Sequence, residues 1–422
     1  MTPIFKPIKL GKITLALLTC LAVLATATAA QKIGAAPWAK RLKQPPAQAP
    51  QRAAPGGAPQ FGDPLAGLST DELAAFTGGR DEFEAVETVA GGLGPIFNDS
   101  SCVACHSAGG TGGASNQKVT RFGRSVGGVF SPLDHLGGSL LQARAIDPAV
   151  QEHVPAEANV VAQRLATPLF GAGLIEAIPD AEIELNARRP QPDGVRGRAL
   201  KITDVASGQP RIGRFGWKAQ QATLLSFAGD AYLNEMGVTS RLFPTENAPN
   251  GNQALLARYD KVPDVEDSVD PATGLSDIDH AAAFMRLLAP PPPVRATAAS
   301  LAGGKLFEQT RCSACHQPVM LTGPSPVRAL AYQPVRLYSD LLLHDMGALG
   351  DGIEQDGAKA REMRTAPLWG LRIRPAFLHD GRALSVGQAI LLHDGAAARS
   401  RDRFKALKPA EQQQLLAFLQ TL

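Results

Sequence analysis

Hydrophobic and polar residues alternate at helical spacing in several parts of the chain. Apolar residues on one face predict helices over residues 70–76, 82–89, 278–288 and 409–422. The glycine pair Gly78-Gly79 separates the first two of these helices. Residues 107–160 are rich in Gly and Ser and predict loops. The pattern therefore indicates a mainly α fold with much loop.

Breaks in this pattern divide the chain into segments. Residues 31–61 are rich in Ala, Pro, Gly and Gln and predict a flexible tether. Four prolines in a row cannot continue a helix, so residues 290–294 predict a linker. Two domains follow from these breaks, over residues 62–289 and 295–422, and each ends in an amphipathic helix.

The first thirty residues have the pattern of a secretory signal peptide. Three lysines precede an apolar run from Ile13 to Leu24, and small residues follow at 27–30. The run is too short and too rich in Thr and Ala for a membrane span, so we expect none after cleavage. Cys20 lacks the small residue that normally precedes a lipoprotein cysteine, which disfavours a lipid anchor. These features predict a periplasmic or secreted protein.

Composition excludes some classes of function. The chain has 422 residues, 44% of them hydrophobic, and a net charge of +3. Its Lys and Arg residues are scattered rather than clustered, so no nucleic-acid partner is expected.

The sequence Cys-Val-Ala-Cys-His at 102–106 returns as Cys-Ser-Ala-Cys-His at 312–316. Two thiols at this spacing bond the two vinyl groups of one haem, and the adjoining His binds its iron. A four-cysteine zinc site would bring its two halves closer together in the sequence. We therefore expect two covalent c-type haems. One is held by Cys102, Cys105 and His106, and the other by Cys312, Cys315 and His316.

The surroundings of the two boxes repeat as well. Residues 166–171, Ala-Thr-Pro-Leu-Phe-Gly, resemble residues 365–370, Thr-Ala-Pro-Leu-Trp-Gly. Segments 94–97 and 304–307 share a Gly-x-x-Phe pattern that resembles the first helix of cytochrome c domains. The repeat predicts two cytochrome c-like haem domains, the first enlarged by insertions.

Several longer strings resemble the family of di-haem oxidoreductases and peroxidases. They are Phe-Asn-Asp-Ser-Ser-Cys-Val-Ala-Cys-His (97–106), Thr-Pro-Leu-Phe-Gly-Ala-Gly-Leu-Ile-Glu-Ala-Ile-Pro-Asp (167–180), Gly-Arg-Phe-Gly-Trp-Lys-Ala (213–219), Tyr-Ser-Asp-Leu-Leu-Leu-His-Asp-Met-Gly (338–347) and Phe-Leu-His-Asp-Gly-Arg (377–382). This family is similar to bacterial di-haem cytochrome c peroxidases. The resemblance implies that one haem reacts with peroxide while the other relays electrons.

The resemblance also implies a distal ligand for the second haem in the segment that follows residues 377–382. His393 stands there in place of the family's Met or Tyr, and Met346 is the alternative. Met320 is too close to His316 to reach the far face. For His379 we expect a structural role, in ordering the turn or a haem propionate, with Arg382 as its neighbour.

At the first haem, the resemblance makes Glu235 the candidate acid and base for peroxide cleavage. Trp217 is the candidate relay between the haems, with plain packing as the alternative. Glu176 ranks below Glu235. The sixth ligand of this haem stays open among His135, His153 and Met236.

These assignments favour an exported, peroxidase-like oxidoreductase that takes electrons at the C-terminal haem and reduces peroxide at the N-terminal haem. A di-haem electron carrier without catalysis is one alternative, and an oxidase of a protein, thiol or other organic partner is another. A small cytochrome or cupredoxin is the expected electron donor. Calcium, a further ion of the related peroxidases, has no ligands that the sequence assigns.

Overall fold

The computed structural model describes residues 59–292 and 294–422. The predicted signal peptide, Cys20 and nearly all of the predicted tether lie outside the described residues. Within these two ranges, no helix combines the length and the apolar character that a bilayer span requires.

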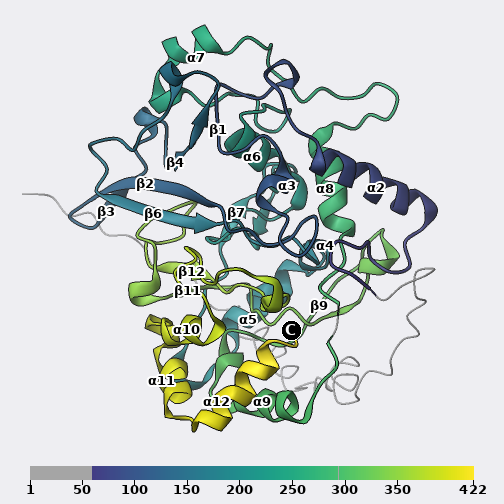
Figure 1. The fold of residues 1–422 in the computed structure, drawn as a ribbon, viewed down its shortest axis with the longest axis vertical. Helices are drawn as coiled ribbons and strands as arrows, with labels where there is room; N and C mark the ends of the chain where they lie inside the picture. The colour runs from purple at the N-terminus through teal and green to yellow at the C-terminus, as the bar shows by residue number, and fades with distance from the viewer. Residues whose placement is uncertain (1–58, 293) are drawn as a thin grey trace, which may run out of the picture. The chain divides into compact units, whose positions relative to one another are not determined.

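Helices and loops make up most of the described chain, with short strands between them (Figure 1). The helices are α2 (Thr70–Glu84), α3 (Cys102–Cys105), α4 (Ala172–Glu176), α5 (Asp180–Arg188), α6 (Leu224–Ala231), η5 (Tyr232–Met236, a π-helix), α7 (Gln253–Tyr259), α8 (Asp277–Leu287), α9 (Ala298–Gln309), α10 (Val386–Leu391), α11 (Ala398–Ala406) and α12 (Pro409–Leu419). The strands are β1 (Ile96–Phe97), β2 (Lys118–Val126), β3 (Val129–Ser131), β4 (Leu140–Leu141), β5 (Arg144–Ala145), β6 (Val160–Leu165), β7 (Lys201–Thr203), β8 (Pro210–Ile212), β9 (Met320–Leu321), β10 (Pro334–Val335), β11 (Leu343–Asp345) and β12 (Glu362–Arg364). The helices predicted near 278–288 and 409–422 are confirmed as α8 and α12.

Helix α2 packs along α8 (Figure 1). It runs without a break through Gly78-Gly79, so the predicted split into two helices is wrong. A Cβ on Gly79 would overlap the backbone of α8 at His280 and lie 2.9 Å from the Phe284 nitrogen. The glycine therefore lets two helices approach closely and does not end one.

Helices α9 and α12 form a second close pair near the C-terminus (Figure 1). A Cβ on Gly303 of α9 would overlap the Gln414 carbonyl of α12. Residues 304–307 lie in α9 as expected, but residues 94–97 are not helical, because Ile96 and Phe97 pair with β5 as strand β1. The expected first helix at residues 94–97 is therefore absent.

Residues 118–165 form an antiparallel sheet where the sequence predicted loops. Strand β2 pairs with β3, β4 and β6, and its register with β6 runs from Lys118 opposite Leu165 to Gly123 opposite Val160. Polar and apolar residues alternate over only part of strand β2. The sequence pattern in this Gly-rich region therefore did not predict a strand. The sheet brings Arg121 and Arg164 next to the first cysteine box, as described below.

The buried hydrophobic side chains of the described residues form one large core and two smaller ones, of which the smallest contains Leu200, Ala219, Leu343 and Ala358. The large core extends from Leu65 to Trp369 and includes Met320, Leu341 and Leu342, which follow the proline run. The other small core joins α9, α10, α11 and α12 around Phe307, Phe404 and Leu415. The second half of the chain therefore contributes to all of these cores.

Two turns, one at residues 215–221 and one at 377–383, have the same backbone conformation. Phe215 forms a bridge with Gln221, and Phe377 forms the same bridge with Ala383. Positive φ angles occur at corresponding places in the two turns, at Gly216 (73°) and at Leu378 (69°). Each turn then leads into a capped helix, α6 after Thr223 and α10 after Ser385.

Candidate haem sites

The first cysteine box forms the short helix α3, which starts after Ser101 and ends at Cys105, with His106 as its C-cap. The Nδ1 atom of His106 lies 3.3 Å from the carbonyl oxygen of Gly113. A hydrogen bond from Nδ1 leaves Nε2 as the free acceptor, the form of imidazole that binds a metal. Burial lowers the pKa of His106 to about 4, so the ring is neutral at pH 7.

The second box turns in the same way. Its Cys312–Ala314 segment is a 3-10 helix, and the Nδ1 atom of His316 lies 3.0 Å from the carbonyl oxygen of Tyr338. Burial, with the nearby His393 ring adding to it, lowers the pKa of His316 to about 4. None of the four cysteines in the two boxes forms a disulfide.

Each box lines a large cavity, of about 1470 Å³ for the first and about 1300 Å³ for the second. A partly buried arginine with a buried Nε atom lines each cavity, Arg121 in the first and Arg374 in the second. The Nε–H of each has no hydrogen-bond partner among the described residues, although a buried donor normally has one. Two thiols, a neutral imidazole and an unpaired guanidinium donor fit a haem, whose two carboxylates would accept from the arginine. Both cavities therefore fit this cofactor.

His393 lies opposite His316 across the second cavity. Their ring centres are 6.4 Å apart. Two imidazoles that bind opposite sides of one metal ion through bonds of about 2 Å have ring centres roughly 6 Å apart. The Nδ1 atom of His393 lies 2.7 Å from the Ala389 carbonyl, which leaves its Nε2 free. Met346 also lines this cavity.

Glu235 lines the first cavity from the π-helix η5. Its carboxylate accepts a hydrogen bond of 2.8 Å from the side-chain amide of Asn98, and its backbone carbonyl accepts from the amide nitrogens of Asn98 and Asp99. Burial raises the pKa of Glu235, while Asn98 and Arg121 oppose the rise. The carboxyl group is thus held in one position and retains its proton to higher pH than an exposed glutamate.

Trp217 lines both cavities. Its indole N–H donates to the Leu165 carbonyl at 2.8 Å, and its own carbonyl accepts from the amide of Arg364 at 2.8 Å. A buried ion-pair network starts at the next residue, where Lys218 lies 2.9 Å from Asp351 and Asp351 lies 2.7 Å from Arg164. The indole is therefore fixed between the two candidate haem sites.

Of the other candidate residues, some line a cavity and some do not. His135 and His153 are exposed and line neither cavity, so the structure does not support them as sixth ligands. Glu176 pairs with Arg286 at 2.6 Å, and Met320 is buried in the large core. Met236 does line the first cavity, and His379 lines the second. The side chain of Arg382 forms an ion pair with Asp380.

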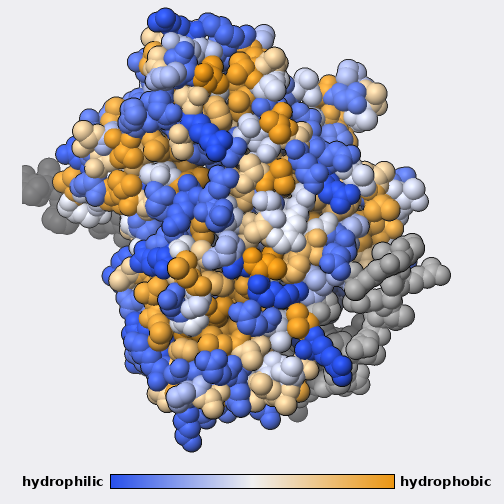
Figure 2. Space-filling view, in the orientation of Figure 1, coloured by the Kyte–Doolittle hydropathy of each residue, from blue (hydrophilic) through white to orange (hydrophobic). Residues whose placement is uncertain are grey.

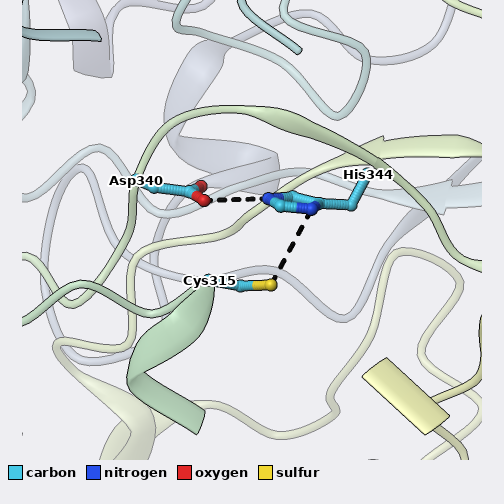
Figure 3. Close-up of side chains that lie close together, drawn as sticks. All are labelled: Cys315, Asp340 and His344. Atoms are coloured by element: carbon cyan, nitrogen blue, oxygen red, sulfur yellow. Dashed lines mark hydrogen bonds and ion pairs between the residues drawn. The ribbon is translucent and has the colours of Figure 1, made fainter. Parts of the chain in front are cut away.

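Sequence reasoning missed a buried pair beside the second box (Figure 3). The Nε2 atom of His344 lies 2.8 Å from the Asp340 carboxylate, and its Nδ1 atom lies 3.8 Å from the Cys315 sulfur. Burial alone would lower the pKa of His344, but the hydrogen bonds to Asp340 and Cys315 raise it to about 11. The only signal in the sequence is the Asp-x-x-x-His spacing within residues 338–347.

A search of curated proteins found no significant match. Solved structures with a similar course of the chain include a hydrazine synthase from Kuenenia stuttgartiensis, at 15% identity and a TM-score of 0.40 over 88% of this chain and 97% of that one. They also include the diheme peroxidase BthA from Burkholderia thailandensis (14%, 0.39, 87% and 92%) and a MauG-like protein associated with microbial copper homeostasis (16%, 0.38, 88% and 95%).

A family sequence profile matches about two thirds of the chain. The profile described as "Di-haem oxidoreductase, putative peroxidase" matches residues 147–422, which include the second cysteine box, Trp217, Glu235 and His393. The match confirms the resemblance seen in the sequence. The chain therefore belongs to the di-haem oxidoreductase family.

Proposed function

We propose that this chain is an exported di-haem peroxidase with c-type haems. The first haem is bound by Cys102, Cys105 and His106, in a domain over residues 62–289. The second haem is bound by Cys312, Cys315 and His316, in a domain over residues 295–422. Electrons from a small periplasmic cytochrome or cupredoxin enter at the second haem, and peroxide is reduced at the first.

The asymmetry of the repeat carries this proposal. His393 follows the helix cap Ser385 at the same spacing as Ala231 follows the helix cap Thr223. Ala231 lines the first cavity and His393 lines the second. An iron with two strong axial ligands suits electron transfer, whereas an open position suits reaction with a substrate. A methyl group at Ala231 supplies no ligand at the position equivalent to His393, which favours the first site as the one that reacts with peroxide.

The protein's own contribution is proton transfer and positioning. A haem bound in each cavity supplies the redox chemistry. Reduction of hydrogen peroxide to two waters takes up two electrons and two protons. Glu235 accepts the proton of one peroxide oxygen and returns it to the other, which leaves as water. Asn98 keeps the carboxylate aimed at the cavity, and Trp217 provides an oxidisable ring between the two sites.

Turnover of hydrogen peroxide by the haem-loaded protein, with a reduced small cytochrome as donor, tests this function. We expect Glu235→Gln to lower kcat roughly 100- to 10,000-fold, the usual contribution of a general acid and base. Haem content and the absorption spectrum should not change. If the wild type is inactive and both haems are low-spin, the protein is an electron carrier and the proposed function is wrong. If wild type and variant turn over peroxide equally fast, the role of Glu235 as acid and base is wrong.

A further inference from the structure

One tyrosine, Tyr232, reaches the first haem cavity. All four tyrosines of the chain lie within the described ranges, and of these only Tyr232 lines either cavity. The residue is 2% exposed. It stands where α6 passes into the π-helix η5, which also carries Glu235. A π-helical turn within a helix is rare and is frequently found at functional sites. The phenol ring is therefore enclosed beside the proposed peroxide site.

The hydroxyl group of Tyr232 is bonded to a carboxylate. It donates to the Oε1 atom of Glu82, on helix α2, at 2.7 Å. Burial raises the pKa of Tyr232 well above its usual value, and the charge and hydrogen bond of Glu82 add to the rise. The side chain therefore remains a phenol at neutral pH. A base within about 2.6–3.2 Å of a donor atom is close enough to take its proton directly. Glu82 is thus placed to accept the phenol proton.

Glu82 belongs to a group of carboxylates that leads towards the surface. Carboxylate oxygens of Glu82, Glu87 and Asp277 lie within 4.8 Å of one another, and all three residues are half-buried. Burial, together with the charges of Glu82 and two aspartates, raises the pKa of Glu87 to about 7. Figure 2 shows hydrophilic residues at the surface over α2. A proton given to Glu82 can therefore be shared within this group and exchanged with solvent.

We propose that Tyr232 is a redox-active residue of the first haem site, with Glu82 as its proton acceptor. The inference rests on the proposed peroxidase function. Peroxide takes two electrons, whereas a small cytochrome or cupredoxin delivers them one at a time. A phenol that loses an electron becomes a strong acid, so its oxidation requires a base that accepts the proton. Tyr232 has such a base and lends the first site one of the two electrons.

The electron and the proton of this step leave Tyr232 in different directions. The electron passes to the first haem site once peroxide has oxidised that site. The phenol O–H bond breaks as its proton moves to the Glu82 carboxylate. The buried ring is neutral before and after the step, which avoids the cost of an isolated charge in an apolar environment. An electron from the second haem and the proton on Glu82 then restore the phenol. Over a full cycle, two electrons and two protons reduce one hydrogen peroxide to two waters.

Trp217 lacks a proton acceptor of this kind. It lines both cavities, but its indole N–H donates to the backbone carbonyl of Leu165, which is not a base. An oxidised Trp217 therefore keeps its proton and its charge inside the protein. This difference suits Trp217 to brief transfer between the haems and Tyr232 to storage of one oxidising equivalent beside the first haem.

Electron paramagnetic resonance of the haem-loaded full chain tests the inference. The protein is mixed with an equimolar amount of hydrogen peroxide, without a donor protein, and frozen within milliseconds. We expect the wild type to show an organic radical signal whose hyperfine structure narrows when the chain is made with ring-deuterated tyrosine. Tyr232→Phe should lose this signal. Its haem content and absorption spectrum should equal those of the wild type, which shows that the variant folds.

Three further variants separate the two roles. Tyr338→Phe removes a hydroxyl that interacts with Arg336 and lies outside both cavities, so the signal should remain. Glu82→Gln cannot take the proton, and the signal should appear roughly 100-fold more slowly, the lower end of what a positioned base contributes. The matched control is Glu84→Gln on the same helix. The Glu84 carboxylate accepts from the Thr111 hydroxyl, so this variant should leave the rate unchanged.

The possible results distinguish this inference from the proposed function. A wild type that reacts with peroxide but forms no tyrosine radical overturns the inference and leaves the proposed function standing. A signal of undiminished size in Tyr232→Phe also overturns it, since the radical then lies elsewhere. An unchanged rate in Glu82→Gln overturns the role of Glu82 as proton acceptor. A wild type that does not react with peroxide overturns the proposed function and this inference together.

Discussion

The rings of Trp217 and His379 meet edge to face, with centres 6.2 Å apart. The two residues occupy equivalent positions in the repeat, since each lies two residues after the phenylalanine that forms the turn's bridge. The two turns therefore contact each other through equivalent side chains. Trp217 also lines both cavities.

Replacement of this indole should slow electron transfer between the haems. We expect Trp217→Phe to lower the rate at which electrons from the second haem reach the first, because Phe is much harder to oxidise. Loss of the hydrogen bond to Leu165 should also cost about 1 kcal/mol of unfolding free energy. Stopped-flow reduction followed at two wavelengths measures the rate. Trp369→Phe, in a buried tryptophan that lines neither haem cavity, is the control and should leave the rate unchanged.

Removal of the imidazole opposite His316 should change the spin state of the second haem. We expect His393→Ala to convert this haem from low-spin to high-spin, because the iron loses its sixth ligand. His393→Met should keep it low-spin and raise its reduction potential. Absorption and electron paramagnetic resonance spectra distinguish these states. Met346→Leu should have no effect, and a high-spin second haem in that variant would show that Met346 is the ligand instead.

The equivalence of Ala231 and His393 predicts a gain of ligand. Ala231→His should place an imidazole over the first haem, make its spectrum low-spin and abolish turnover of peroxide. Ala231→Leu is the control for bulk, since it fills the same space without offering a ligand. A high-spin first haem in Ala231→His would contradict the equivalence of the two helices.

Asp230 should make stability depend on pH. Burial, opposed by Arg121 and reinforced by Glu235 and Asp356, raises the pKa of Asp230 to about 6. The folded state then binds this proton more tightly than the unfolded state, so its contribution to stability is present at low pH and is lost as the pH rises to about 6. Between about pH 4 and pH 7, Asp230→Asn should gain about 3 kcal/mol of unfolding free energy relative to the wild type. Urea denaturation across this range measures the gain, and a difference that does not vary with pH would contradict it.

Local features of the sequence identified most of the candidate site. A cysteine box needs only five adjacent residues, and a helix such as α8 shows its apolar face within three turns, so both are visible without the fold. The glycine pair in α2 was misread, because a glycine that breaks a helix and one that fits against another helix look the same in a single sequence. The partner that decides between them, His280, lies about 200 residues away.

Contacts between residues far apart in the sequence could not be predicted for the same reason, because the partner residue is not known before the fold. His344 reaches Cys315 only because strand β11 passes beside the second box, and no spacing rule connects them. Glu246 appears as an ordinary surface glutamate in the sequence, but the fold leaves only 6% of it exposed. Burial of a charged group is a property of the whole fold. Residues whose chemistry depends on burial are therefore the hardest to predict from a sequence.

The sharing of the large core has a consequence for how this protein is made. Met320, Leu341 and Trp369 come from beyond the proline run, yet they fill the same core as α2 and α8. A nascent chain released only as far as residue 289 lacks these side chains, so we expect the first half to wait for the second before it packs. Because the two halves of the chain share this core, truncation at the linker should yield two aggregating fragments rather than two single-haem proteins.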